Sequence, residues 1–212
     1  AAAALLVTFP AVGKSDKKGA GQSPDKKMIK TLITSETRIK LLMKFFLNSS
    51  IKAHLRGLES EFGESSNAIR LELNRFEEAG LLHSLKDGNK KLYQANQKHP
   101  LFSDIHSMLL KQSGIDKVIE KVIHRMGNLE TIFLTGDFAR GMDSPVIELI
   151  FVGADIDREY LSRKVSHAEE ICGRKVSYVI LQPAESTSYI NKLTAVLPLW
   201  NNGEHKTTKQ VY

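Results

Sequence analysis

Apolar residues recur at helical spacing in two consecutive stretches near the beginning of the chain. The first, "TSETRIKLLMKFFLN", places apolar side chains at the i, i+3, i+4 and i+7 positions that form one buried helix face. Thr34 or Ser35 is a suitable N-cap for this helix. The second stretch, "AHLRGLESEFG", is shorter and ends at Gly63, a residue that easily adopts the left-handed conformation after a helix. The pattern therefore predicts two helices joined by a short turn.

A third amphipathic stretch, "ESSNAIRLELNRFEEAG", follows directly and can be capped by Ser65 or Ser66. Its apolar face consists of Ile69, Leu73, Phe76 and Gly80. The opposite face carries Asn67, Arg70 and Asn74. Amide and guanidinium groups can make paired hydrogen bonds with base edges in the major groove of DNA. The third predicted helix therefore has a face whose chemistry suits the reading of DNA.

A β-hairpin is predicted after the third helix, in "GLLHSLKDGNKKLYQAN", because Asp-Gly between two apolar runs is a strong turn signal. Its tip carries Lys86, Asn89, Lys90 and Lys91. Basic side chains close to a helix that reads DNA are suited to contacts with backbone phosphates.

The run from residue 55 to residue 96 resembles the ArsR/MarR-like winged-helix transcriptional regulators of bacteria, in the spacing "L..L...FG.S...I...L..FE.AGLL" and in the "DGNKK.Y" that follows. The resemblance covers residues 30–96 and implies a winged helix-turn-helix that binds double-stranded DNA. The metal-sensing cysteine pairs of some ArsR members are absent, which argues against a metal sensor. The expected DNA contacts are Ser65, Ser66, Asn67, Arg70, Asn74, Lys86, Asn89, Lys90 and Lys91. A winged helix that contacts another protein is the alternative.

The spacing of apolar residues between positions 98 and 127 predicts two further helices, and the second of these has a wide apolar stripe. Such a stripe packs against both flanking domains or against a second copy of the chain. A winged helix that reads a palindrome needs a partner related by twofold symmetry, so a homodimer is expected.

Strand and helix patterns alternate from residue 129 to residue 181, which predicts a small α/β layer. The predicted helix of residues 158–172 is preceded by Asp157 and followed by Gly173, and its inner face is expected to include Leu161, Val165 and Ile171.

The loop between the first two of these strands reads "TGDFARG" and is followed by "VIEL" on the second strand. This arrangement resembles the minimal nucleotidyltransferases of the DNA polymerase β superfamily, which carry Gly-Ser-x-Ala-Arg-Gly and then Asp-x-Asp on the next strand. The residues that match or replace positions of that pocket are Gly136, Asp137, Arg140, Gly141 and Glu148.

The departures from the nucleotidyltransferase pattern concern the groups that would perform the chemistry. Asp137 replaces the serine, and Val146-Ile147-Glu148 replaces Asp-x-Asp, so a single carboxylate remains. Nucleotidyl transfer needs carboxylates that hold Mg²⁺ against the triphosphate. The sequence therefore predicts a degenerate nucleotide pocket without catalytic residues, metal or cofactor. The alternatives are a nucleotidyltransferase that transfers a nucleotide from an NTP with Mg²⁺, and a regulator whose pocket senses a nucleotide without chemistry.

Composition and charge agree with a regulator that binds a polyanion. The net charge is +6, and the excess lies in residues 1–96. No apolar run is long enough to cross a membrane. The single cysteine, Cys172, excludes an intrachain disulfide and is typical of a reducing, cytoplasmic location.

The sequence as a whole predicts an α+β protein, an N-terminal winged helix-turn-helix followed by a small α/β nucleotidyltransferase-like domain. The expected segments are a disordered tail or extension (1–27), a winged helix (28–97), a helical linker (98–127), the nucleotidyltransferase-like domain (128–200) and a polar tail (201–212). The predicted function is a dimeric DNA-binding transcriptional regulator whose C-terminal domain serves as a scaffold or senses a small-molecule or nucleotide effector.

Overall fold

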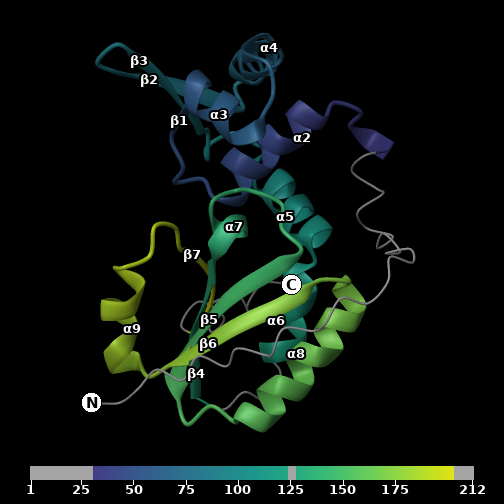
Figure 1. Cartoon of the computed structure of the whole chain (residues 1–212), viewed down its shortest axis with the longest axis vertical. Coiled ribbons are helices and arrows are strands. Elements are labelled where there is room, and N and C mark those ends of the chain that lie inside the picture. The colour runs from purple at the N-terminus through teal and green to yellow at the C-terminus, as the bar shows by residue number, and fades with distance from the viewer. Residues whose placement is uncertain (1–30, 124–127, 203–212) are drawn as a thin grey trace. The chain divides into compact units, whose positions relative to one another are not determined.

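The computed structural model describes residues 31–123 and 128–202 and shows a mixed α+β protein with two small sheets (Figure 1), which confirms the predicted class. The chain divides into two compact units. The helix–hairpin unit contains residues 31–113 together with 137–144, and the sheet unit contains the other described residues from 114 onward. The predicted tail of residues 1–27 and all of the C-terminal tail beyond residue 202 lie outside the described residues.

Three helices and a hairpin follow one another in the helix–hairpin unit, in the predicted order. The cap of the first helix is Ser35, whose side chain accepts a hydrogen bond from the Arg38 amide, and the cap of the third is Ser65. Gly63 ends the second helix with a φ of 64°. The helices are α2 (Glu36–Leu42), which continues as the π-helix η1 (Met43–Leu47), α3 (Leu55–Phe62) and α4 (Ser66–Glu78).

The hairpin consists of β2 (Leu82–Asp87) and β3 (Lys90–Ala95), and β3 also pairs with a two-residue strand, β1 (Ala53–His54), which the sequence did not predict. Asp87 pairs with Lys90. The central turn residues are therefore Gly88 and Asn89 rather than Asp-Gly. Gly88 has a φ of 56°, as the first position of a type II′ turn requires.

The predicted linker does not form one structural segment. Helix α5 (Phe102–Ser113) belongs to the helix–hairpin unit, where His106 Nδ1 lies 2.8 Å from the Phe46 carbonyl oxygen. Helix α6 (Ile115–Ile123) belongs to the sheet unit and packs against α8 (Arg158–Cys172), with Val118 and Val122 fully buried. The apolar stripe of α6 thus contributes to the core of its own unit, so it provides no evidence for the expected dimer surface.

The sheet unit is built on four strands in the order β6-β5-β4-β7, with β5 parallel to β6 and the other neighbours antiparallel. Helix α8 connects the two parallel strands, as a crossover between parallel strands must. The sequence patterns did not predict α9, and the predicted end of this domain lies one residue before the end of β7. The elements of this unit are β4 (Asn128–Thr135), β5 (Val146–Ala154), α8 (Arg158–Cys172), β6 (Lys175–Leu181), α9 (Pro183–Ile190) and β7 (Leu197–Asn201). The short helix α7 (Gly136–Ala139) follows β4, and its residues 137–139 belong to the helix–hairpin unit.

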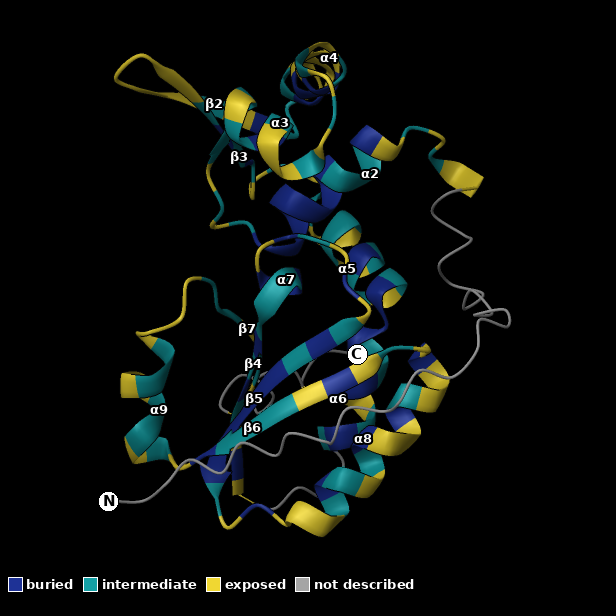
Figure 2. Cartoon of the chain, viewed as in Figure 1, coloured by how far each residue is buried: buried dark blue, intermediate teal, exposed yellow. Residues whose placement is uncertain are grey.

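Burial along α8 follows the predicted inner face except at its end (Figure 2). Asp157 caps the helix by accepting a hydrogen bond from the Tyr160 amide, and Gly173 ends it. Cys172 is buried, whereas Ile171 is 37% exposed. The prediction for Ile171 was therefore wrong, because residues one position apart in a helix point about 100° from one another.

Candidate nucleic-acid interface and glycine loop

The exposed face of α4 carries the residues predicted to read DNA. Asn67, Arg70 and Asn74 are all exposed. An Arg70 Nη atom donates a hydrogen bond to Asn67 Oδ1 over 2.8 Å. Because both partners face solvent, this bond can be exchanged for bonds to another polar surface at little cost. The arrangement presents a guanidinium and two amides along one side of a 13-residue helix.

The N-terminus of α4 is organised by Ser65, whose hydroxyl oxygen accepts a hydrogen bond from the Ala68 amide. Ser65 is exposed and Ser66 is half-buried. The first amides of a helix are donors without intrahelical partners, and they can bind phosphate oxygens. Both serines therefore lie at a helix terminus whose free amides can bind an anion.

Leu71 is a member of this face that the sequence prediction omitted. It is 49% exposed and lies between Asn67 and Asn74, at the i+4 position of an i, i+4, i+7 row. The signal that could have revealed it was an apolar residue outside the buried face of α4. In the major groove, an exposed apolar side chain can contact the methyl group of thymine.

Glu72 lies on the inner face of α4, among its apolar residues, and fixes the helix to α2. Its side chain is 8% exposed, and its carboxylate accepts two hydrogen bonds from Arg38, over 2.8 and 3.1 Å. Arg75 donates a third over 2.9 Å. Burial alone raises the pKa of the Glu72 carboxyl group, but the hydrogen bond and charge of Arg38, together with Arg75, outweigh burial and hold the pKa below its usual value.

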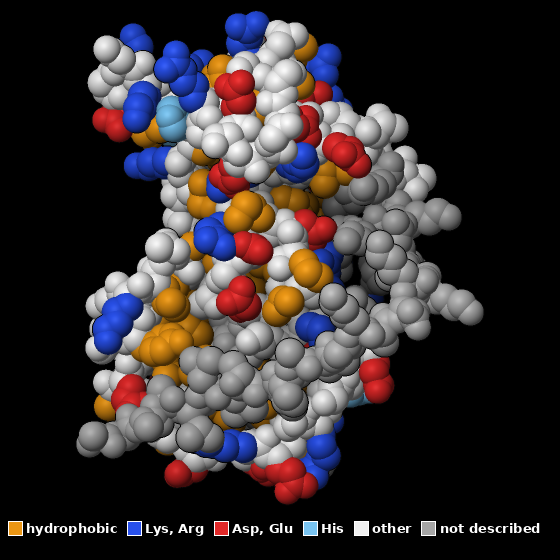
Figure 3. Space-filling model, viewed as in Figure 1, with side chains coloured by type: hydrophobic (Ala, Val, Ile, Leu, Met, Phe, Trp, Pro, Cys, Tyr) orange, Lys and Arg blue, Asp and Glu red, His pale blue; other side chains and the backbone are white. Residues whose placement is uncertain are grey.

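Lysines gather around the tip of the β2–β3 hairpin (Figure 3), but they differ in their partners. Lys86, Asn89 and Lys90 are exposed. Lys91 donates to Glu77 of α4 over 2.7 Å and lies over the ring of Tyr93. The hydrogen bond with Glu77 raises the pKa of Lys91, and the same bond lowers the pKa of Glu77. Lys91 therefore connects the hairpin to α4, a role that the sequence did not indicate.

The glycine loop, residues 137–144, belongs to the helix–hairpin unit although the strands that flank it belong to the sheet unit. Gly141 has a φ of 75°, and a Cβ atom there would lie 2.5 Å from Lys44 Cα and 2.6 Å from the Lys44 carbonyl oxygen. This glycine therefore allows the loop to approach the backbone of η1.

Two side chains of η1 and its C-cap bind the carbonyl oxygens of the glycine loop. Asn48 Nδ2 donates to the Ala139 oxygen over 2.7 Å. Lys44 Nζ donates to the Arg140 oxygen over 2.9 Å and to both carboxylate oxygens of Glu61 over 2.6 and 2.7 Å. The Lys44 side chain is 10% exposed, and these bonds use all three of its donors.

The five residues predicted to line a degenerate nucleotide pocket are divided between the units. Asp137, Arg140 and Gly141 lie in the glycine loop, where the Arg140 guanidinium donates to the Asp137 carboxylate. Gly136 and Glu148 lie in the sheet unit, and a Cβ atom on Gly136 would overlap the Glu148 carboxylate. The loop residues thus have structural contacts with one another and with η1.

Neither a metal cluster nor a membrane span is found in the part of the chain that the structure describes. Residues 31–123 and 128–202 contain no group of three or more His, Cys, Asp or Glu side chains that could hold a metal ion. None of their helices combines the length and apolar character that a bilayer span requires.

Comparison with known proteins gives distant structural likenesses. No family model and no curated protein matches the chain. A candidate nucleotidyltransferase from Sulfolobus solfataricus is 21% identical, over 44% of this chain and 88% of that one, with a TM-score of 0.32. The transcriptional regulator BldR from the same organism is 13% identical, over 48% and 73%, with a TM-score of 0.33. An archaeal chromatin protein is 13% identical, over 78% and 76%, with a TM-score of 0.26. Because these TM-scores are low, any function must be inferred from the residues of this chain.

Proposed function

We propose that this protein is a DNA-binding transcriptional regulator in which α4 enters the major groove and the β2–β3 hairpin contacts the phosphate backbone. The observation that carries the proposal is the exposed face of α4, where Asn67, Arg70 and Asn74 lie in one row without an acidic residue in the first turn. An α-helix with its side chains is about 10–12 Å across, which suits a major groove that is about 12 Å wide. A homodimer would place two such helices about one turn of DNA apart.

The charge of the hairpin supports the same orientation. Lys86 and Lys90 extend from the part of the hairpin farthest from the buried residues Leu82 and Ala95. The ion pair of Lys91 with Glu77 connects the hairpin to α4, so helix and hairpin can meet the duplex as one surface. Basic groups beside a groove-reading helix set its position on DNA, whereas the amides and guanidinium read the bases.

We further propose that the nucleotidyltransferase-like part of the chain has a structural or sensing role and no catalytic one. The close approach of Gly141 to Lys44 and the bonds to the loop carbonyl oxygens support a loop that serves packing. Glu148 is the one carboxylate left at the position of the metal-binding pair. Transfer of label from ATP or CTP in the presence of Mg²⁺, abolished by Glu148→Gln, would contradict this part of the proposal.

The double variant Arg70→Ala/Lys90→Ala is expected to weaken binding to duplex DNA at least about tenfold and to reduce the slope of log K against log salt by about one unit, because one phosphate contact is lost. Fluorescence anisotropy over a salt series, with duplexes selected from random sequence, measures both quantities. Lys91→Ala is the matched control. Since Lys91 is paired with Glu77, its removal is expected to change the salt slope less than the double variant does. Unchanged affinity of the double variant would refute DNA binding through this surface.

Leu71 is expected to give the site a preference for thymine. Replacing thymine with uracil in the selected duplex removes one methyl group and leaves the hydrogen-bonding groups unchanged. Burial of a methyl-sized group contributes about 0.8 kcal/mol, so the wild-type protein should bind the uracil duplex about fourfold more weakly. Leu71→Ala should bind both duplexes equally, whereas Leu85→Ala, at another exposed leucine, should keep the wild-type preference. Equal wild-type affinity for the two duplexes would exclude this role of Leu71.

A further inference from the structure

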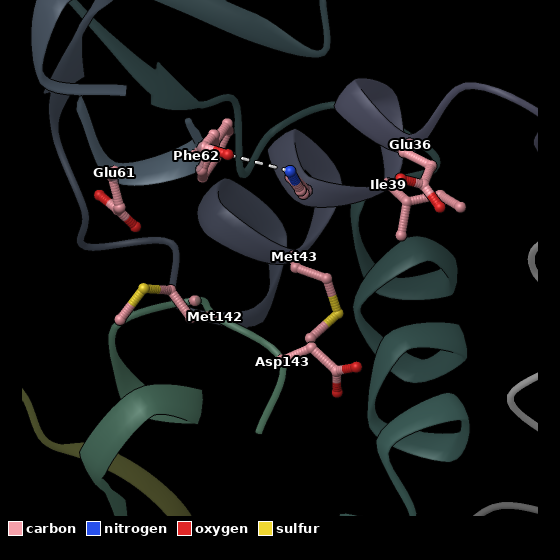
Figure 4. A pocket seen from close by; sticks show the side chains of 9 residues that line it. Glu36, Ile39, Met43, Glu61, Phe62, Met142 and Asp143 are labelled. Carbon is pink, nitrogen blue, oxygen red and sulfur yellow. Dashed lines mark hydrogen bonds between the residues drawn. The ribbon is translucent and has the colours of Figure 1, made fainter. Parts of the chain in front are cut away.

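A cavity of about 330 Å³ lies within the helix–hairpin unit, between α2, α3 and the glycine loop (Figure 4). The charged side chains that line it already interact with other residues, as Lys40 does with the Phe62 carbonyl oxygen over 3.1 Å. These charged residues are Glu36, Lys40, Glu61 and Asp143. Their charges are therefore satisfied within the protein. In the described part of the chain, backbone groups without such partners lie instead at one edge of the four-stranded sheet.

The two edge strands of the sheet unit differ in how their edges are protected. The order β6-β5-β4-β7 places β6 and β7 at the edges of the described sheet (Figure 1). Folded proteins protect such edges with proline, charged side chains or bulges. Strand β7 contains Pro198, and its pairing with β4 has a register shift. Strand β6 pairs with β5 at seven consecutive positions without a shift, and its residues 176–181, VSYVIL, include neither proline nor a charged side chain.

Alternate residues of β6 direct their backbone groups away from β5. The Lys175 amide donates to the Pro145 carbonyl oxygen over 3.0 Å, and this bond sets which residues of the parallel strand face β5. The N–H and C=O groups of one residue in a parallel strand point to the same side. The residues that bond to β5 are therefore 175, 177, 179 and 181, and those that face outward are 176, 178 and 180.

The outward groups of β6 are only partly used. The Val176 amide donates to a carboxylate oxygen of Glu169, on α8, over 2.8 Å. Among the described residues, none binds the outward N–H and C=O groups of Tyr178 and Ile180. Two donors and two acceptors on this strand are thus available to another strand.

The side chains along this edge are mainly apolar, and the sheet holds them in place. Tyr178, Val179 and Ile180 are half-buried. The Tyr178 ring meets the Phe151 ring edge-on, with centroids 5.8 Å apart. Val179 packs against the buried cluster that contains Ile150. A paired strand would cover the apolar surface that remains exposed on these side chains.

We propose that two copies of the chain form a homodimer in which their β6 strands pair antiparallel about a twofold axis at Val179. In this register Tyr178 faces the partner's Ile180, and each of the two such pairs exchanges two N–H···O=C bonds. Val179 faces the partner's Val179 in the closely spaced kind of pair, where β-branched side chains contact well. Lys175 lies four positions from the axis, so like charges are not opposite one another. A twofold pairing closes the assembly at two copies.

This pairing depends on the backbone of β6 and does not rest on DNA binding. It would, however, supply the twofold partner that the proposed reading of a palindrome needs. Both tests of the pairing are made on the full chain without DNA, so its failure and the failure of DNA binding through α4 are observed separately.

Light scattering and analytical ultracentrifugation should find the wild type dimeric at micromolar concentrations. Val179→Lys places two ammonium groups opposite one another and should raise the dissociation constant of the dimer at least about tenfold. Mixing Val179→Lys with Val179→Glu should restore a dimer, because opposite charges then face each other, and the restored dimer shows that both variants fold. Leu199→Lys, at a half-buried residue of β7, is the matched control and should leave the dimer intact. A monomeric wild type, an undiminished Val179→Lys dimer, or a mixture that forms no heterodimer would overturn the proposal.

Hydrogen exchange resolved to single amides tests the register without a substitution. The Tyr178 and Ile180 amides should exchange at least about tenfold more slowly in the dimer than after dilution to the monomer, because pairing binds both of them. The Ser177 and Val179 amides face β5 and should exchange at the same rate in both states. If exchange at Tyr178 and Ile180 does not change with protein concentration, β6 does not pair with a second copy and the proposal is wrong.

Discussion

Replacing Gly141 with alanine is expected to destabilise the helix–hairpin unit by roughly 2–5 kcal/mol. Two costs add at this position. A side chain at a φ of 75° is strained by about 1–2 kcal/mol. The new Cβ atom would also lie 2.5 Å from Lys44 Cα, and backbone atoms inside η1 cannot move aside as the end of a flexible side chain can. The clash is expected to separate the loop from η1 and to expose the bonds made by Lys44 and Asn48.

Gly63→Ala is the matched control for this substitution. Gly63 has a similar φ, 64°, but no atom lies within 4 Å of the position that its Cβ would occupy. Its replacement should cost only the backbone strain, about 1 kcal/mol. Urea unfolding followed by circular dichroism gives the two free energies, and hydrogen exchange in residues 43–48 reports whether the loop has separated. If the two variants lose equal stability, the loop does not pack against Lys44 as described.

The sequence could predict the elements whose causes are local. Ser35, Ser65 and Asp157 cap helices within three residues of their own positions, and Gly63 and Gly173 end helices through their own backbone conformation. Apolar periodicity likewise identified the buried face of α4. In each case the atoms that interact are close along the chain, so the pattern contains the information needed.

The sequence could not predict contacts between distant segments. Gly141 matches a nucleotidyltransferase motif, but the neighbour that requires a glycine there is Lys44 on η1. The role of Lys44 itself was hidden, because a lysine within "LLMKFFL" gives no sign that its ammonium binds Glu61 and a loop carbonyl oxygen. Lys91 appeared to be a free phosphate contact for the same reason. Such pairings depend on how the elements pack, and local patterns do not encode this.

A similar limit applies to the exposed face of α4, which we propose reads DNA. The polar residues Asn67, Arg70 and Asn74 were identified because their chemistry matches base edges. Leu71 was overlooked because apolar residues are usually assigned to the core, although many remain exposed on folded proteins. Knowing which residues α4 buries changes the set of candidate base contacts, and it also reveals Glu72, a charged residue inside the face that the pattern describes as apolar.

Replacing Glu72 with glutamine is expected to destabilise the helix–hairpin unit by about 2 kcal/mol at neutral pH. The substitution keeps the size of the side chain but removes the charge, and its amide group would place donors against the donors of Arg38. Loss of one partner from a fully buried ion pair costs about 3–5 kcal/mol. The smaller value applies here because the Arg38 side chain is 37% exposed and can be hydrated. Glu77→Gln, which breaks a more exposed pair in the same unit, should cost less than about 1 kcal/mol.

The wild type and Glu72→Gln are expected to differ in their free energy of unfolding, and the pH dependence of that difference distinguishes a charge effect from a packing effect. The pKa of Glu72 is lowered in the folded protein, so its charge stabilises the fold fully above the pKa of an unfolded glutamate, about 4.3. That stabilisation is lost as the pH falls through the lower pKa of the folded state. The wild type and Glu72→Gln should therefore differ most near pH 7 and converge in acid, as measured by urea unfolding at a series of pH values. A difference that stays constant down to pH 3 would mean that Glu72 acts through its shape and not through its charge. Arg38 would then hold α4 no more firmly with a carboxylate as its partner than with an amide.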